Sequence, residues 1–283
     1  MPAQLLDGRA VAAAIRADVA AGAAGLQAAT GVSPALATVL VGDDAAAKAY
    51  TRAIARAAAA AGMACRQVRL DAATDDPGLR DAVRRLNDDS SVHGIIVQFP
   101  LPPQVSPAAA GEALDPRKDV DGITPQNAGR LALGRPGFVP STPLGGLELL
   151  RHYQIALPGL DATVVGRSAV VGKPLALLLL NEHATVTVCH TRTRDLAAAC
   201  RRADVLCAAA GRPGVITQDM IKPGAVVLDF GTTPGPSGAL LGDVDFAGAS
   251  QVASWITPVP GGTGPVTTAV LLRTTLAAAR ALA

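Results

Sequence analysis

The chain has 283 residues, of which 49% are hydrophobic and 17% are charged, and its formal net charge is +2. This length suits one large domain or two ordinary ones, and the composition is typical of folded, soluble proteins. The small charge and the 2% aromatic content argue against nucleic acid as a partner. No apolar run is long enough to span a membrane, and charges from Asp7 to Asp18 would interrupt a signal-peptide core.

The cysteines Cys65, Cys189, Cys200 and Cys207 form neither metal-binding pairs nor a disulfide-dense pattern. We therefore expect buried, reduced thiols, no metal and a cytoplasmic protein. The sequence also lacks HExxH, GxSxG and Walker-type motifs, so metalloprotease, serine-hydrolase and P-loop functions have no support.

The N-terminal part predicts helices alternating with strands. An amphipathic helix is expected over the first 30 residues, ending near Gly31. Strands are expected at 35–42, 64–70 and 92–102, and helices at 43–63 and 76–89. Such a series predicts an α/β unit with a parallel sheet, in which ligands gather at the carboxyl ends of the strands.

The regular alternation of helices and strands is interrupted between residues 100 and 143. Prolines cluster at the start of this segment, and DPRKDVDGITPQNAGRL (115–131) is polar, turn-rich and fits no regular element. A long irregular segment inside a compact protein is usually a functional loop. Lys118, Asp119 and Asp121 bring charge to this loop, although a merely solvated loop is the simpler interpretation of these residues alone.

A helix at 142–153 is expected to link this part to a second α/β series. Strands are expected at 162–166, 184–190, 204–211 and 225–231, and helices at 173–182 and 193–203. The fold class predicted is therefore α/β, with two lobes and a cleft between them.

The segment VVGRSAVVGKP (164–174) runs from a strand into a helix. Its glycines, Gly166 and Gly172, do not form the GxGxxG fingerprint, but the free amide groups at the helix start would face an anion. The next strand ends in CHTRT, which offers Arg192 and no acid before Asp195. Since a basic residue at this place favours a 2′-phosphate, the pattern favours NADP; a solvated basic loop is the alternative.

Two further segments attract notice. Gln98 falls inside an otherwise apolar strand, and a buried amide needs partners, which either neighbouring loops or a ligand could provide. TPVPGGTGPVT (257–267) has three prolines and three glycines, which predicts a rigid hairpin that could close over a flat ligand.

Seven motifs, in order along nearly the whole chain, carry a family resemblance: VQFPLP, KDVDGITPQNAGRL, STPLGGLELL, VVGRSAVVGKP, TVTVCHTRT, GDVDF and TPVPGGTGPVT. They resemble the methylenetetrahydrofolate dehydrogenase/cyclohydrolase family of the FolD type. The resemblance implies a homodimer that binds tetrahydrofolate derivatives between an N-terminal catalytic lobe (1–120) and a Rossmann-type NADP lobe (141–263). The helix at about 264–283 is expected to pack back on the first lobe. The family oxidises 5,10-methylenetetrahydrofolate with NADP, and most members then hydrolyse the methenyl product to 10-formyltetrahydrofolate.

The resemblance also implies roles for individual residues. Tyr50 matches the tyrosine that packs on the folate rings, Gln98 the glutamine that hydrogen-bonds in the active site, and Asp121 the carboxylate that holds the pterin. The positions that match NADP-binding segments are Gly166, Arg167, Ser168, His190, Thr191 and Arg192. The positions that match the loop lining the folate cleft are Pro260, Gly261 and Gly262.

One position departs from the family. Members have a lysine four residues after this tyrosine, where this chain has Ile54. Lys48, Arg52 and Arg56 lie two or six positions from Ile54 and therefore point away from its helix face. Hydride transfer mainly needs two orientated flat molecules, whereas hydrolysis needs a titratable group, which is typically worth about 10²–10⁴ in rate. We therefore expect oxidation to be retained and cyclohydrolase activity to be impaired or lost.

Two alternatives come from other functional classes. The chain could be a non-catalytic or regulatory paralogue that binds folate without turning it over. It could also be a dehydrogenase for another substrate, such as an amino or keto acid, although the retained Gln98, Asp121 and TPVPGG loop argue against this.

Overall fold

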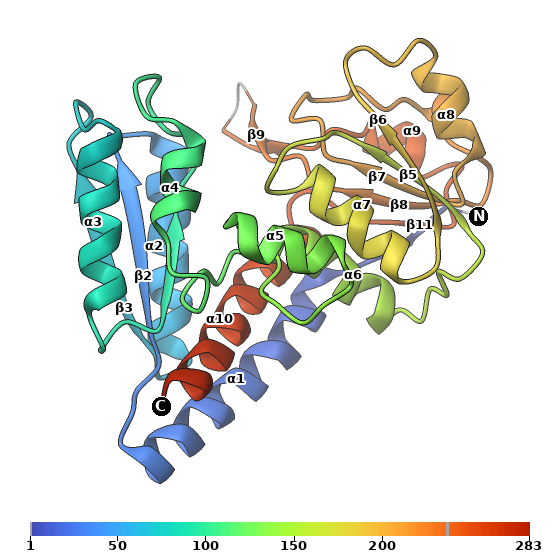
Figure 1. Ribbon diagram of the computed structural model, residues 1–283. Coiled ribbons are helices and arrows are strands. Elements are labelled where there is room, and N and C mark those ends of the chain that lie inside the picture. The colour runs from blue at the N-terminus through green and yellow to red at the C-terminus, as the bar shows by residue number, and fades with distance from the viewer. Residues whose placement is uncertain (1, 236–237) are drawn as a thin grey trace. The chain divides into compact units, whose positions relative to one another are not determined.

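The computed structural model describes residues 2–235 and 238–283, and its chain divides into two compact units (Figure 1). The three-stranded unit comprises Ala13–Ser141 and Thr268–Ala283. The six-stranded unit comprises Met1–Ala12 and Thr142–Thr267. Within the described residues, no helix combines the length and the apolar character that crossing a membrane requires.

The three-stranded unit is built on a parallel sheet with the strand order β3-β2-β4. Its strands are β2 (Ala35–Val41), β3 (Ala64–Leu70) and β4 (Gly94–Val97). Helix α2 (Ala45–Ala60) joins β2 to β3, and α3 (Asp76–Asp88) joins β3 to β4. The expected strand–helix order and the parallel sheet are confirmed.

The two faces of this sheet carry different side chains. Ala37 and Val39 of β2 form a core with Val97 of β4 and with Leu79 and Val83 of α3. Because side chains alternate along a strand, Thr38 of β2 and Gln98, which follows β4, point to the face turned away from α3. The sheet thus presents a mainly apolar face to α3 and places the buried polar side chains of Thr38 and Gln98 on the other.

The segment 100–143, predicted to be irregular, contains two short helices. They are α4 (Pro107–Ala113) and α5 (Pro125–Ala132), and α6 (Ser141–His152) begins at its end. Both short helices start at a proline that follows a capping residue, Ser106 or Thr124, whose hydroxyl accepts a backbone N–H. A capping hydroxyl followed by proline is a strong helix-start signal, and it outweighs the polar, turn-rich texture of the segment.

Lys118 stabilises the end of α3. Its side chain is buried, and Nζ donates to the carbonyl oxygens of Leu86, Asn87 and Asp89 at 3.3, 2.7 and 2.7 Å. The last carbonyl groups of a helix have no hydrogen-bond partner within the helix. The ammonium group of Lys118 supplies donors to carbonyl oxygens that would otherwise lack a hydrogen bond.

The six-stranded unit is a parallel sheet with the order β1-β11-β8-β7-β5-β6. Its strands are β1 (Gln4–Leu5), β5 (Asp161–Val165), β6 (Thr185–Cys189), β7 (Val205–Ala208), β8 (Val226–Asp229) and β11 (Trp255–Ile256). Its connections include α7 (Gly172–Asn181), α8 (Leu196–Arg202), the 3-10 helix η1 (Gln218–Met220) and α9 (Phe246–Ala249). A separate antiparallel pair is formed by β9 (Thr233–Pro234) and β10 (Leu240–Leu241).

Two expectations about the chain ends differ from the structure. The first residues form strand β1, which pairs with β11, and the helix α1 (Gly8–Thr30) begins only afterwards. The stretch 257–267 is not a hairpin, because the long helix α10 (Thr263–Leu282) already begins within it. Helices α1 and α10 run side by side (Figure 1), and Gly22 lies against Leu276 and Arg280.

The four cysteines are all free thiols. Cys189, Cys200 and Cys207 are buried, as expected, whereas Cys65 on β3 is only half-buried. Burial raises the pKa of Cys200 and of Cys207 to about 12, so both thiols stay protonated at neutral pH.

The substitution Lys118→Met tests the cap on α3. It leaves three buried carbonyl groups without a donor, so we expect the free energy of unfolding to fall by about 2–3 kcal/mol. Urea denaturation followed by circular dichroism measures this loss. Arg117→Ala is the matched control, because Arg117 is exposed and solvent screens its ion pair with Asp115, so little stability is expected to be lost. Equal losses in the two variants would show that the cap contributes nothing of its own.

Candidate functional site

Tyr50 lies on α2, which begins after Asp44, whose carboxylate accepts the backbone N–H of Ala47 at 2.8 Å. The buried face of α2 consists of Ala47, Thr51, Ile54 and Ala58. Tyr50 is half-buried, and Ile54, one turn later, is 0% exposed. One turn of α2 therefore separates a partly accessible phenol from a buried hydrocarbon side chain, and no ionisable group stands at position 54.

The phenol of Tyr50 meets Thr268 and Asp121. Burial and the neighbouring Asp121 carboxylate raise the pKa of Tyr50, and a hydrogen bond with the side chain of Thr268 acts against this rise. The phenol is therefore protonated at neutral pH and keeps an O–H that it can donate. Thr268 belongs to α10, near the other end of the chain, and nothing in the local sequence marks it as a member of this site.

Asp121 is held by Ser141. Its Oδ1 accepts the backbone N–H of Ser141 at 3.0 Å and the Ser141 hydroxyl at 2.7 Å. Burial raises the pKa of Asp121 to about 6, Ser141 opposes that rise through both hydrogen bonds, and the charge of Asp119 adds to it. The carboxylate is thus mostly ionised at neutral pH but close to its titration range.

The other two charges of the KDVDG motif belong to the framework. Asp119 is fully buried and accepts the N–H groups of Ile123 and Thr124 and the side-chain amide of Asn127, at 2.9–3.0 Å. Lys118 caps α3, as described above. The structure therefore brings only Asp121 of this motif to Tyr50.

Gln98 follows β4, and its backbone N–H continues the sheet by donating to Val39 at 2.8 Å. Its side chain is 4% exposed, and Nε2 finds no hydrogen-bond partner within the described residues. The hydroxyls of Thr38 and Thr51 are also buried without partners there. A buried amide that the protein leaves unsatisfied favours the ligand interpretation of Gln98 over the structural one. Gln98 makes no hydrogen bond with Tyr50 or Asp121 in the described chain.

In the six-stranded unit, Gly166 directly follows β5 and has a φ of +134°. A Cβ atom there would collide with the carbonyl oxygen of Ala209, so only glycine lets the chain turn past the end of β7. The hydroxyl of Ser168 accepts the N–H groups of Val171 and Gly172 at 3.1 and 3.3 Å. The N–H of Lys173 donates to the carbonyl oxygen of Ser168 at 3.0 Å, and Pro174 has no N–H. The expectation of free amides at this helix start is therefore wrong, because Ser168 satisfies all three N–H groups.

A tight turn follows β6. The N–H of His190 donates to Thr193 Oγ1 at 2.8 Å, and the N–H of Arg192 donates to His190 Nδ1 at 3.1 Å. The side chains of Arg167, Thr191 and Arg192 are exposed. Asp195 is the first acid after the turn, and its carboxylate caps α8 by accepting the N–H of Ala198 at 2.8 Å. Cations are therefore free at this strand end, whereas the acid is engaged.

Two buried aspartates, to which the sequence analysis assigns no role, hold the loops of this unit. Asp229, at the end of β8, accepts the N–H groups of Gly231, Asp243 and Val244 at 2.8–3.0 Å. Asp243 in turn accepts those of Ala210 and Gly211 at 2.6 and 2.8 Å. Burial raises the pKa of Asp229. In the sequence, the feature that could have identified both aspartates is an acidic residue directly next to apolar residues such as Leu228 or Val244.

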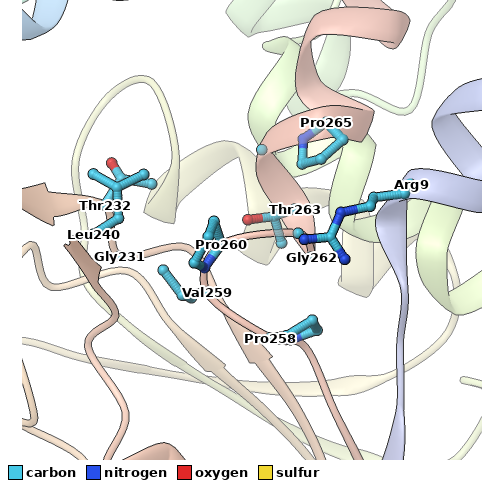
Figure 2. Close-up of a pocket in the computed structure, with 12 residues that line it drawn as sticks. Arg9, Gly231, Thr232, Leu240, Pro258, Val259, Pro260, Gly262, Thr263 and Pro265 are labelled. Atoms are coloured by element: carbon cyan, nitrogen blue, oxygen red, sulfur yellow. The ribbon is translucent and has the colours of Figure 1, made fainter.

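A cavity of about 230 Å³ lies in the six-stranded unit (Figure 2). Its walls are formed mainly by the stretch from Pro258 to Pro265, by Gly231 and Thr232, and by Arg9. Pro260, Gly261 and Gly262 all line it, so the three loop residues singled out from the sequence share one cavity. Figure 2 shows the guanidinium of Arg9 reaching toward this loop. Arg9 supplies the only charged side chain among the described cavity-lining residues.

Two family profiles match the chain. The tetrahydrofolate dehydrogenase/cyclohydrolase catalytic domain matches residues 6–121, and the NAD(P)-binding domain of the same family matches residues 140–283. A relative from Roseiflexus sp., the bifunctional protein FolD, is 51% identical over 280 residues, which cover 99% of this chain and 97% of the relative.

Solved structures agree with these matches. The bifunctional FolD enzyme of Campylobacter jejuni superimposes with a TM-score of 0.95 at 42% identity, covering 98% of this chain and 99% of its own. The FolD enzyme of Trypanosoma brucei, which was crystallised with NADP and an inhibitor, gives a TM-score of 0.95 at 40% identity, covering 99% and 98%. By sequence and by fold, over nearly its full length, this chain belongs to the tetrahydrofolate dehydrogenase/cyclohydrolase family.

Proposed function

We propose that this protein oxidises 5,10-methylenetetrahydrofolate to 5,10-methenyltetrahydrofolate with NADP, and that its cyclohydrolase activity is impaired or lost. The observation that carries the proposal is the position of Tyr50 beside Asp121, with a fully buried Ile54 one turn away. Tyr50 and Asp121 provide a hydrogen-bond donor and an acceptor for a reduced pterin. Position 54 lacks the titratable group that hydrolysis requires.

The side chains of the three-stranded unit suit a flat heterocycle with both donors and acceptors. The protonated phenol of Tyr50 offers an aromatic surface and a donor, and Asp121 offers an acceptor. Gln98 offers an amide group that the protein itself leaves unsatisfied. These groups would bind and orientate the folate, and such positioning is the main contribution a protein makes to hydride transfer.

The residues of the six-stranded unit fit NADP. When bound, NADP supplies the hydride acceptor, and the turns after β5 and β6 would hold it. Gly166 allows the close backbone approach that a dinucleotide requires, and Arg167 and Arg192 are exposed cations suited to a 2′-phosphate. The first acid after β6, Asp195, lies three residues beyond Arg192 and caps α8, so a basic residue and not an acid stands nearest the strand end. The NADP bound by the Trypanosoma brucei relative supports the same choice.

The cationic side chains near position 54 in the sequence, and the buried Lys118, do not replace a lysine at that position. Lys48 forms an ion pair with Asp43, and Arg52 and Arg56 are exposed, whereas Ile54 is buried. Lys118 donates to the carbonyls at the end of α3. None of these groups can move a proton at the folate carbon as a lysine at position 54 would, so the water that attacks the methenyl group has no base at this position.

The proposal also includes a homodimer and a cytoplasmic setting. Strand β3 is the outer strand of its sheet and most of its residues are exposed, which leaves an edge that a second copy could cover. The four free thiols suit a reducing compartment.

A paired assay of the purified protein tests the function. NADPH formation from methylenetetrahydrofolate is expected at a rate usual for enzymes, about 1–10³ per second. The methenyl absorbance is then expected to decay no faster than in buffer alone. Methenyl hydrolysis at a rate typical of the family would refute the loss of cyclohydrolase. Folate binding without NADPH formation would instead indicate a non-catalytic paralogue.

The substitution Ile54→Lys is expected to raise methenyl hydrolysis by about 10²-fold or more, because it returns a titratable group to the helix face of Tyr50. Burial would lower the pKa of the new amine toward neutrality, where it can accept a proton. Ile54→Met is the matched control, since it changes shape without adding a titratable group. No gain in a folded Ile54→Lys variant that still forms NADPH would show that further positions had diverged.

The cofactor preference is tested by Arg192→Ala. Loss of a charge-assisted contact to the 2′-phosphate is expected to lower kcat/KM for NADP by about 10–100-fold, with little change for NAD. Arg194→Ala removes the same charge from the same exposed turn and is expected to change the NADP:NAD ratio little. An unchanged ratio in Arg192→Ala would exclude this arginine from cofactor choice.

The homodimer is tested by light scattering after size-exclusion chromatography. The expected mass is twice that of the 28.4 kDa chain. A mass equal to that of a single chain at micromolar concentration would contradict this part of the proposal.

A further inference from the structure

Ser141 makes two hydrogen bonds to a single oxygen atom. Its backbone N–H and its hydroxyl donate to Oδ1 of Asp121 at 3.0 and 2.7 Å, and Ser141 itself is 2% exposed. Hydrogen bonds to an ionised carboxylate are about twice as strong as neutral ones. These two hydrogen bonds therefore fix the orientation of the Asp121 carboxylate.

The other oxygen of Asp121 is left open. Within the described residues, Oδ2 accepts no hydrogen bond from the protein, in contrast to Asp119, whose two oxygens both accept donors from the framework. With Oδ1 occupied twice, Oδ2 is the atom that remains to meet an N–H donor of a ligand.

Ser141 is well placed for this task. It is the first residue of α6, so its N–H points out of the helix start, where the helix dipole favours a negative charge. It lies 20 residues after Asp121, and the contact closes the segment that contains α5. Ser141 is the first residue of the STPLGGLELL motif and lies just inside the NAD(P)-binding-domain match, which begins at residue 140, but it is not among the residues to which the resemblance gives a binding role.

We propose that Ser141 is a positioning residue for the substrate: by holding Oδ1 of Asp121 with two hydrogen bonds, it presents Oδ2 to an N–H group of the reduced pterin. This inference rests on the proposed function, since it takes Asp121 as the group that receives the folate. It adds a residue that acts through Asp121 without contacting the substrate.

The arrangement has a consequence for pH dependence. Burial and the charge of Asp119 disfavour the ionised form of Asp121, Ser141 favours it, and the uncharged Tyr50 phenol faces it from α2. The pKa of Asp121 is about 6 with Ser141 in place, so the carboxylate stops accepting as the pH falls through that value. Without the hydroxyl, the ionised form loses a donor and the pKa rises further.

The substitution Ser141→Ala tests the proposal through the pH profile of kcat/KM for methylenetetrahydrofolate, which reports the free enzyme. We expect the acid limb, near pH 6 in the unaltered protein, to move up by about one pH unit. The accompanying loss at pH 6 is about fivefold and lies in KM more than in kcat. Ser141→Thr keeps a hydroxyl and is expected to return the limb toward its original position.

Ser106→Ala is the matched control. Ser106 also stands at a helix start, where its hydroxyl accepts the N–H of Ala108, and it has no contact with Asp121. We expect this variant to keep the pH profile of the unaltered protein. A Ser141→Ala variant that loses activity equally at all pH values, with the limb in place, would show a merely structural role and overturn the proposal.

A second measurement separates this inference from the proposed function. The carboxyl carbon of Asp121 can be titrated by NMR in the ligand-free protein, with Asp121→Asn to assign its signal. Ser141→Ala is expected to raise the midpoint by about one pH unit. An unmoved midpoint overturns the proposal even if the protein proves not to be a dehydrogenase. A midpoint that moves while the catalytic limb stays also overturns it, because Asp121 would then not receive the substrate.

Discussion

Buried carboxylates that accept backbone N–H groups hold the loops of both units. Past the end of a parallel strand, the backbone has no neighbouring strand to pair with, and buried N–H groups must find another acceptor. Asp119 and Asp121 provide it in the three-stranded unit, and Asp229 and Asp243 provide it in the six-stranded unit. In the three-stranded unit the loop held in this way contains Asp121, to which the proposed function assigns a binding role, so its geometry is set before a ligand arrives, and that lowers the cost of ordering it on binding.

The carboxylates differ in how their two oxygen atoms are used. Asp119 and Asp229 use both oxygen atoms to hold backbone groups. Asp121 uses one oxygen, and both of its hydrogen bonds come from Ser141. A motif such as KDVDG therefore contains two residues that build the loop and one that the loop presents. Within this motif, Asp121 differs from Asp119 in having one oxygen without a hydrogen bond from the described residues. Asp243 of the six-stranded unit also leaves one oxygen, Oδ1, without a partner there, but that atom is buried.

Position 54 is where the proposed function separates two reactions. Under that proposal, Tyr50, Gln98 and Asp121 orientate the folate, which requires shape and a few hydrogen bonds. Moving a proton to or from water requires a titratable group, and isoleucine has none. The structure shows Ile54 fully buried on the same face of α2 as Ala47 and Ala58, so its side chain packs among apolar neighbours.

The sequence by itself determined the α/β class, the parallel direction of the strands and the family, and it shows that residue 54 is an isoleucine, which has no titratable group. These follow from local periodicity, from glycine and proline positions and from motif order, all of which are encoded by neighbouring residues. Tertiary structure alone decided which polar residues act together. Thr268 meets Tyr50 from the far end of the chain, Ser141 meets Asp121 across 20 residues, and Arg9 meets the loop around Gly261. A side-chain hydrogen bond between distant segments leaves no periodic trace in the sequence, because its energy depends on where the folded backbone places the two groups.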